Sequence, residues 1–363
     1  MADSTHTRPA NSPIKGRGAV SQTENRFAVR HVEEESEFAQ DSVAPETTLT
    51  AMAAKSIISS NQSPDIPFDR SINPYQGCEH GCVYCYARPS HSYLDLSPGL
   101  DFETRIFYKP NAEKALLDTW EKKSYECRPI TIGANTDPYQ PAERKLKITR
   151  SLLKLFLEHR HPVSIITKGT LLERDLDILG PLADKGLCSI AVSIPTADNR
   201  LKRLLEPRVP AAAARFALIR KLADRGVPVS LMMAPIIPAI NDSEIESILE
   251  QAAAAGVQHA AYIFLRLPHE VRHIVKEWLQ SHFPDRAEHV MSLVRQASGG
   301  KDYDNRFGIR QRGRGPYADM IRQRFKRACA RFGMDQEVSE TRGSLDCSQF
   351  RPPGPDQLDL GLF

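Results

Sequence analysis

Short apolar runs alternate with longer amphipathic segments along the middle of the chain. Several runs are rich in β-branched residues and apolar on both faces, which is typical of buried parallel strands. Strands are predicted at Ser71–Tyr75, Pro129–Ala134, Val163–Thr167, Leu187–Ser193, Val227–Met233 and Ala260–Leu265. The intervening segments have helix-like starts and stops, such as Pro210 and Gly256. The pattern predicts an α/β fold with six strand–helix units within residues 66–280.

Six strand–helix units are too few for a complete eight-stranded barrel. They suit a partial barrel, although an open doubly wound sheet has the same alternation. In both architectures the binding site lies at the carboxyl ends of the strands. Side chains that directly follow a predicted strand are therefore the first candidates for function.

The segments on either side of this region differ from it in composition. Residues 1–65 are polar and are expected to form a largely disordered or extended arm, with Gly16–Gly18 and Asn25–Phe27 as weak anchor candidates. Residues 281–351 are predicted to be a basic extension, since residues 301–333 contain ten lysines and arginines against three aspartates. A solvated helix face with a basic loop explains this charge as well as contact with a polyanion does.

Overall composition excludes some classes of protein. The 363 residues are 41% hydrophobic, enough for a substantial core, and the formal net charge of +3 is too small to indicate nucleic-acid binding by the chain as a whole. No apolar run has the length of a membrane span, and no apolar secretory core opens the chain. The protein is expected to be cytoplasmic and to have no membrane partner.

Three closely spaced cysteines are the most informative residues. Cys78, Cys82 and Cys85 form a C-x₃-C-x₂-C run, with Gly77 and Gly81 where a loop wrapping a cluster needs backbone freedom. Iron–sulfur cubanes are normally held by four thiolates, so three would leave one iron open to a substrate or cofactor. A zinc site usually needs a second cysteine pair, which is absent, although His80 remains an alternative fourth ligand. A disulfide framework is disfavoured by the odd number of cysteines.

The cysteine run resembles that of the radical SAM superfamily, with Tyr84 at the usual aromatic position before the last cysteine. The resemblance implies a partial (βα)6 barrel and a [4Fe-4S] cluster held by Cys78, Cys82 and Cys85. It also implies that the open iron binds S-adenosylmethionine, which one electron from the cluster cleaves to a 5′-deoxyadenosyl radical. A donor such as flavodoxin or ferredoxin would supply the electron, and Tyr84 would lie against the adenine.

The same resemblance assigns further cofactor contacts to the strand ends. Thr136–Pro141 together with Glu143 looks like the spore photoproduct lyase branch of the superfamily. Asn135 and Asp137 are expected to bind the methionine amino group, with Glu143 a weaker choice. Lys168 is expected to hold the cofactor carboxylate by charge, and Ser193 to contact the ribose or carboxylate. A common Asx-Pro turn and a solvent-exposed lysine are the structural alternatives.

The remaining cysteines, at positions 127, 188, 329 and 347, form no tight run and are expected to be buried or inert thiols. Spore photoproduct lyase returns hydrogen to its product from a cysteine that cannot be matched to any of them, so lyase activity itself stays open.

The last residues, 352–363, are predicted to be a flexible tail held off the body by prolines. Within it, Gln357–Phe363 resembles the peptide that binds the bacterial sliding clamp, although a short apolar tail can also dock on its own domain.

The combined prediction is a cytoplasmic radical SAM enzyme of the spore photoproduct lyase-like group, acting on nucleic acid in DNA repair or modification. The basic extension and the clamp-like tail favour that substrate. One alternative is a radical SAM enzyme that acts on a protein or a small molecule. Another is a non-catalytic iron–sulfur protein that binds DNA or serves as a clamp adapter. The sequence identifies neither the substrate atom, nor the hydrogen-donor residue, nor the oligomeric state, nor whether S-adenosylmethionine is consumed.

Overall fold

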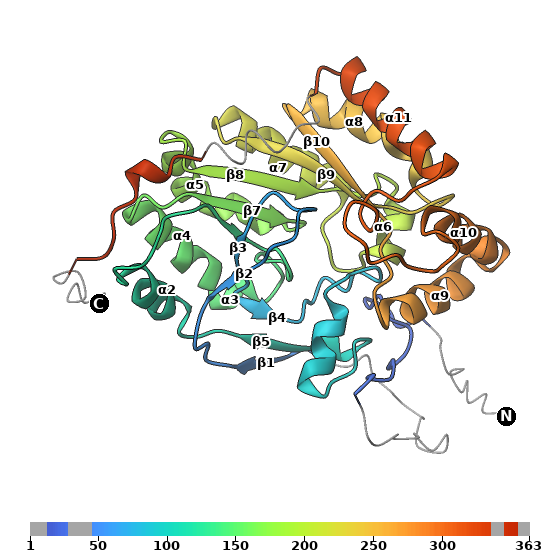
Figure 1. Ribbon diagram of the computed structural model, residues 1–363, viewed down its shortest axis with the longest axis horizontal. Coiled ribbons are helices and arrows are strands. Elements are labelled where there is room, and N and C mark those ends of the chain that lie inside the picture. The colour runs from blue at the N-terminus through green and yellow to red at the C-terminus, as the bar shows by residue number, and fades with distance from the viewer. Residues whose placement is uncertain (1–12, 28–45, 335–344, 355–363) are drawn as a thin grey trace, which may run out of the picture.

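A computed structural model of the chain describes residues 13–27, 46–334 and 345–354 (Figure 1). Its main feature is a seven-stranded sheet in the order β10-β9-β8-β7-β6-β3-β2. The strands of this sheet are β2 (Ile58–Ser60), β3 (Arg70–Ile72), β6 (Ile130–Ile132), β7 (Val163–Thr167), β8 (Cys188–Ser193), β9 (Val229–Ile236) and β10 (His259–Phe264). Each predicted strand is present within a few residues of its expected position.

Six of these strands are parallel, and they follow one another in chain order from β3 to β10. A doubly wound sheet would reverse its order near the middle. The absence of a reversal across these strands favours the partial barrel over the doubly wound alternative, and it confirms the predicted fold class. The seventh strand, β2, pairs antiparallel with β3 at one edge.

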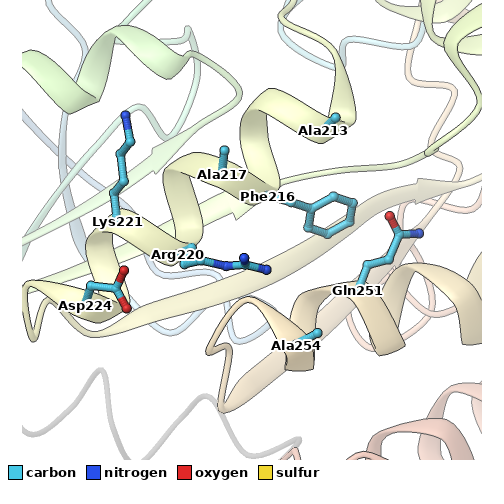
Figure 2. Close-up of a pocket in the computed structure, with 8 residues that line it drawn as sticks. All are labelled: Ala213, Phe216, Ala217, Arg220, Lys221, Asp224, Gln251 and Ala254. Carbon is cyan, nitrogen blue, oxygen red and sulfur yellow. The ribbon is translucent and has the colours of Figure 1, made fainter.

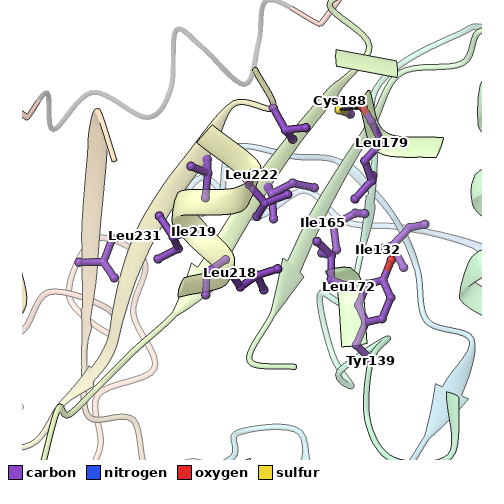
Figure 3. Close-up of a cluster of buried hydrophobic side chains, with 14 of the residues drawn as sticks. Ile132, Tyr139, Ile165, Leu172, Leu179, Cys188, Leu218, Ile219, Leu222 and Leu231 are labelled. Carbon is purple, nitrogen blue, oxygen red and sulfur yellow. Dashed lines mark hydrogen bonds between the residues drawn. The ribbon is translucent and has the colours of Figure 1, made fainter. Parts of the chain in front are cut away.

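Helices connect successive strands, and most of them cover the outer face of the sheet (Figure 1). They are α2 (Ala112–Trp120), α3 (Glu143–Leu146), α4 (Ile148–Glu158), α5 (Leu176–Ala183), α6 (Asn199–Leu205), α7 (Ala212–Asp224) and α8 (Ile245–Ala254), with short 3₁₀ segments at Thr170–Asp175 and Asp242–Glu244. Leu218, Ile219 and Leu222 of α7 pack with residues of the strands in one apolar cluster (Figure 3). Burial of apolar side chains of this size stabilises the fold by about 1.5–3 kcal/mol each.

A second sheet has three strands, β1 (Thr48–Ala51), β5 (Arg105–Tyr108) and β4 (Tyr75–Gln76). Its strand β4 directly follows β3 of the large sheet. The loop that follows β4 contains the three cysteines, and it runs into a 3₁₀ helix (Arg88–Leu94) and then α1 (Asp101–Thr104). This small sheet therefore holds both ends of the segment that contains the cysteine loop.

The chain beyond β10 adds helices rather than further strands. They are α9 (Val271–His282), α10 (Pro284–Ala297) and α11 (Pro316–Arg331), and a 3₁₀ turn (Cys347–Gln349) follows later. Figure 1 shows α11 beside α8 and β10. Phe325 of α11 contacts Tyr262 of β10, with ring centroids 4.8 Å apart. The basic segment is thus partly a helix that packs on the barrel.

Candidate cluster and cofactor site

The cysteine loop has a fixed backbone shape. Gly77 and Gly81 have φ values of +82° and +66°, a region that residues with a Cβ rarely adopt. An added Cβ at Gly81 would lie 2.7 Å from Glu103 Oε2. The backbone freedom expected at these two glycines is therefore confirmed, and at Gly81 the close approach of Glu103 also requires a glycine.

All three motif cysteines are free thiols in this loop. Cys78 and Cys82 are buried, and Cys85 is half-buried. Throughout residues 13–27, 46–334 and 345–354, no group of three or more His, Cys, Asp or Glu side chains converges closely enough to hold a single metal ion. A cubane is larger than one ion and takes each thiolate on a different iron. Three thiolates are the donor type of a cubane and are one fewer than the four ligands of a structural zinc site.

His80 is not placed as a fourth ligand. The imidazole is buried, and its Nδ1 lies 3.3 Å from Asp137 Oδ2. Burial favours the neutral ring, but Asp137 and Cys78 outweigh that effect and raise the pKa of His80 to about 10. The imidazole is thus held as the partner of a carboxylate, which argues against the zinc alternative.

A completely buried arginine, Arg88, binds the backbone of the cysteine loop. The guanidinium of Arg88 donates to the carbonyl oxygen of Cys82 at 3.0 Å and forms an ion pair with Glu103. It also donates to the carbonyl oxygens of Pro98 and Gly99. Both side chains of the ion pair are fully inaccessible, so removing one partner would leave an unpaired buried charge.

The N-terminal segment of residues 17–26, which we call the strap, contacts both the cysteine loop and Glu103. The backbone amides of Gly18 and Ala19 donate to the Glu103 carboxylate at 3.0 and 2.8 Å. A Cβ on Gly18 would lie 1.8 Å from the carbonyl oxygen of Gly81. Further along the strap, Nη1 of Arg26 donates to both carboxylate oxygens of Glu270, at 2.9 and 2.8 Å. Both weak anchor candidates of the sequence therefore contact the core.

Tyr84 belongs to a second buried network. Its hydroxyl donates to Glu206, whose carboxylate is also paired with Arg215 at 3.0 Å. Burial, Cys82 and Glu206 together raise the pKa of Tyr84 well above its usual value. The Nζ atom of Lys168 lies 5.9 Å from the centre of the Tyr84 ring. The structure thus brings two of the expected cofactor residues together beside the cysteine loop.

The Asp137 carboxylate accepts three hydrogen bonds. The donors are the Thr167 hydroxyl and the Lys168 amide, both at 2.7 Å, and the Tyr139 amide at 2.9 Å. Burial raises the pKa of Asp137, but His80 and these donors lower it to about 2. The charged carboxylate therefore ties the end of β7 to the cysteine loop, while direct contact with the cofactor stays a prediction.

The other expected contacts differ in their surroundings. The Ser193 hydroxyl donates to the carbonyl oxygen of Met232 at 3.2 Å, at the end of β8. The side chain of Asn135 is exposed just beyond β6. Burial lowers the pKa of Lys168, but Cys82 and Glu206 outweigh that effect and raise it. Glu143 is fully buried and bonded to Tyr75, Thr149 and Arg174, so it is directed into the protein and away from the cofactor site.

Sequence reasoning missed several residues that build the site. Gln140 is fully buried, and its side chain donates to the Gly77 carbonyl at 3.1 Å while accepting from the Glu79 amide at 3.0 Å. Glu206 is also fully buried, in an ion pair with Arg215. Arg88 is the third residue after Cys85. An isolated arginine usually lies on the surface, so its closeness to the cysteine run was the only signal in the sequence.

An apolar groove on the outer surface is separate from this site. Figure 2 shows that it lies between α7 and α8, on the side of these helices that faces away from the sheet. Its lining residues are Ala213, Phe216, Ala217, Arg220, Lys221, Asp224, Gln251 and Ala254. None of them belongs to the cysteine loop or to the carboxyl ends of the strands, so this groove is not the candidate site.

The fold and the three-cysteine loop together define a class: a partial parallel barrel with an iron–sulfur cluster site at its carboxyl edge. The sequence profile of the Radical SAM superfamily matches residues 72–252. An uncharacterized protein of Mycobacterium tuberculosis is 36% identical over 64% of this chain and 68% of its own length. One of Methanocaldococcus jannaschii is 27% identical over 60% of this chain and 77% of its own. The chain belongs to the radical SAM superfamily, whose cofactors are a [4Fe-4S] cluster and S-adenosylmethionine.

Solved structures of spore photoproduct lyase have a similar fold. A variant of that enzyme matches with a TM-score of 0.58 and 17% identity, over 85% of this chain and 87% of that chain. Spore photoproduct lyase complexed with dinucleoside spore photoproduct matches with a TM-score of 0.56 over 79% and 80% of the two chains. The predicted family and fold resemblance are confirmed. In the part of the chain that the structure describes, no helix is long and apolar enough to cross a membrane.

Proposed function

We propose that this chain is an enzyme that uses S-adenosylmethionine to abstract hydrogen from a nucleic-acid substrate. The observation that carries the proposal is a loop of three free cysteines at the carboxyl edge of a radical SAM barrel. When bound, the cluster and S-adenosylmethionine supply a 5′-deoxyadenosyl radical.

The chain's own residues would hold and orient these groups. Cys78, Cys82 and Cys85 are the cluster ligands. Lys168 would bind the cofactor carboxylate by charge, and Ser193 and Asn135 would contact its polar groups from neighbouring strand ends. Tyr84 would lie against the adenine. Asp137, also expected to contact the cofactor, would act in addition by fixing the Lys168 backbone against His80.

Two observations support nucleic acid as the substrate. The fold is similar to that of spore photoproduct lyase complexed with dinucleoside spore photoproduct. The second observation is the basic segment, of which Lys326 and Arg327 are exposed on α11. Other members of this segment are already paired, for example Arg310 with Asp65 and Arg324 with Glu246. That pairing supports the alternative of a protein or small-molecule substrate, so the test must include both.

Three further parts of the proposal concern the cellular setting. An external one-electron donor, such as flavodoxin or ferredoxin, would reduce the cluster, and a reducing cytoplasm would preserve it. A bacterial sliding clamp would bind Gln357–Phe363, a segment outside the described residues.

The test is anaerobic turnover of reconstituted protein with S-adenosylmethionine and a chemical reductant. Formation of 5′-deoxyadenosine is expected with wild-type protein and not with Cys82→Ala. Deuterated nucleic-acid pools, both damaged DNA and tRNA, are then compared with peptide pools for transfer of deuterium into 5′-deoxyadenosine. Transfer from peptides alone would overturn the nucleic-acid assignment, and no 5′-deoxyadenosine at all would favour a non-catalytic clamp adapter.

A further inference from the structure

One arginine near the cysteine loop lacks the carboxylate partner that its neighbours have. Arg266 follows β10, is half-buried, and its Nε is buried without a hydrogen-bond partner. Its Nη2 lies 3.4 Å from the hydroxyl of Tyr303. Among the described side chains, no carboxylate lies within ion-pair distance of this guanidinium, so no acidic side chain of the described residues balances its positive charge.

Other guanidinium groups around the site are neutralised. Arg88 is paired with Glu103, Arg215 with Glu206, and Arg26 with Glu270. A partly desolvated cation without a counter-ion is costly, because lost hydration is not replaced. Guanidinium is also the group best suited to bind a phosphate through two parallel hydrogen bonds. An unbalanced Arg266 at the carboxyl edge therefore indicates a site for an anionic ligand.

The guanidinium of Arg266 lies over the ring of Tyr86, the residue directly after Cys85. The Cζ atom of Arg266 lies 5.1 Å from the centre of the Tyr86 ring. The Tyr86 hydroxyl donates to the carbonyl oxygen of Ala134, just beyond β6. The ring is thus fixed at its hydroxyl end, yet the residue is 43% exposed. A fixed and exposed aromatic ring is suited to stack on a nucleobase.

These contacts also locate the pair at the opening of the barrel. Tyr86 links the segment after β6 to a side chain that follows β10, and three strands separate β6 from β10 in the sheet. A flat sheet would separate them by about 19 Å, four strand spacings. The contact indicates that the sheet curves and that Tyr86 and Arg266 lie across its opening, next to Cys85.

We propose that Arg266 and Tyr86 bind one nucleotide unit of the substrate, with the guanidinium on a backbone phosphate and the ring against a base. This inference rests on the proposed function and adds the side chains that recognise its substrate. It also explains why the charge is left unbalanced in the free protein, because the phosphate of the ligand supplies the counter-ion.

The test compares two single-stranded octathymidylates, one with ordinary phosphodiesters and one with neutral methylphosphonates, binding to reconstituted protein with S-adenosylmethionine. Arg266→Gln is expected to weaken binding of the phosphodiester oligomer about 10-fold and to reduce its salt slope by about one. Binding of the neutral oligomer should barely change. Arg266→Lys should give an intermediate loss, because it keeps the charge without the planar fork. Tyr86→Leu should weaken both oligomers about 10-fold.

Arg70→Gln is the matched control, because Arg70 also lies over a tyrosine ring, at 5.2 Å from Tyr125, but at the amino end of β3. It should bind both oligomers as the wild type does. Since Arg266 has no carboxylate partner, Arg266→Gln should also keep the wild-type melting temperature.

The outcomes separate this inference from the proposed function. If the wild type and Arg266→Gln bind the phosphodiester oligomer equally well, the Arg266 site is overturned. The proposal of a nucleic-acid substrate is then unaffected. Absence of binding by the wild type would overturn both. Weaker S-adenosylmethionine binding in Arg266→Gln would assign the arginine to the cofactor and so overturn its role in substrate binding.

Discussion

Individual side chains around the cysteine loop are organised by buried charge. Glu103, Glu206 and Asp137 are each held by several donors, and each carboxylate links segments that are far apart in the sequence. A buried carboxylate is stable only where its hydrogen-bonding capacity is met. The loop is therefore held in shape by protein contacts and does not depend on cluster bonds alone.

The cysteine assignments give the first prediction. Replacing Cys78, Cys82 or Cys85 by alanine removes one of three thiolates and should abolish the iron–sulfur absorption and the bound iron of anaerobically reconstituted protein. Cys127→Ala and Cys347→Ala are matched controls, since both thiols are free and half-buried but lie outside the loop. A full cluster in all three motif variants would disprove the assignment.

The second prediction concerns a histidine far from the loop. His161 is buried and stacked on Trp120, with centroids 4.8 Å apart. Its Nδ1 faces the carbonyl oxygen of Pro162 at 3.0 Å, so Nδ1 carries the proton, and Nε2, 2.7 Å from the Tyr125 hydroxyl, accepts. Burial lowers the pKa of His161 to about 3. The folded protein thus keeps this ring neutral at pH values where the unfolded chain protonates it.

Stability should therefore fall as the pH falls from about 6.5, the unfolded pKa, toward the folded pKa. Between pH 7.5 and 5 this one group should cost about 2 kcal/mol of unfolding free energy. Urea denaturation of wild type and His161→Phe across this pH range measures the free energy of unfolding. That free energy should depend less on pH in the variant than in the wild type. His289→Phe, at an exposed histidine, should keep the wild-type dependence. Parallel curves for wild type and His161→Phe would contradict the buried neutral ring.

At the scale of elements, the strap and the cysteine loop form one unit. The strap reaches the loop through Gly18 and reaches α9 through Ser21, whose hydroxyl donates to Glu277 at 2.6 Å. The barrel alone therefore does not complete the cluster site. An N-terminal segment with few large apolar residues contributes because its backbone amides bind the Glu103 carboxylate and its Arg17 side chain donates to the Glu103 carbonyl oxygen at 3.0 Å.

The third prediction tests this unit. Gly18→Ala places a methyl group against the Gly81 carbonyl and should displace the strap, at a cost of about 1–3 kcal/mol. The reconstituted cluster should then bleach several-fold faster in air or with a chelator than in the wild type. Gly354→Ala, where a Cβ meets nothing within 4 Å, is the control. Equal bleaching rates in wild type and Gly18→Ala would mean that the strap does not protect the cluster.

Elements were easier to predict than the contacts among them. The strands from β6 to β10 were predicted within a few residues, because their apolar runs are bounded by turns. The antiparallel β2 and the small β1-β5-β4 sheet were missed, since two to four residues are too few for a periodic pattern. The three-cysteine run could be recognised from its spacing alone, and its role as the cluster ligand set stays a prediction. The roles of Glu206 and Gln140 were not, because tertiary packing decides whether a polar residue is buried.

At the scale of the whole molecule, the distribution of charge bears on the substrate. Ion pairs on the barrel side neutralise Arg310 and Arg324, whereas Lys326, Arg327 and Arg331 are exposed and have no ion pair among the described residues. Only the second group can attract phosphates without first breaking an internal contact. The basic segment is therefore a weaker electrostatic surface than its composition suggests.

The fourth prediction follows from this difference. Replacing Lys326, Arg327 and Arg331 together by glutamine should reduce the salt dependence of nonspecific DNA binding by about two to three units. The control replaces Lys122, Lys123 and Lys185, which are exposed on other parts of the molecule. Fluorescence anisotropy across a salt series measures both slopes. A slope near zero in the unaltered protein would favour a protein or small-molecule substrate.

The C-terminal segment bears on the predicted clamp contact. Its last described part, residues 345–354, docks near the amino ends of the strands: the Arg351 amide donates to the His159 carbonyl at 2.8 Å, and Phe350 contacts His161 at 5.0 Å between centroids. The amino ends lie at the edge of the sheet opposite the cysteine loop. The last described residues of the chain thus lie on the side of the body away from the cluster site.

The last prediction uses this separation. Deleting Gln357–Phe363 should abolish binding to a bacterial sliding clamp, because Leu360 and Phe363 would each contribute about 1.5–3 kcal/mol by burial in clamp pockets. Cleavage of S-adenosylmethionine should be unchanged, since the deleted residues follow a segment docked at the opposite edge. Binding of the tail to the clamp would raise the local concentration of the enzyme at DNA, even if the enzyme itself makes no tight contacts with DNA. Surface plasmon resonance with immobilised clamp measures the effect, and equal binding with and without these residues would disprove the clamp assignment.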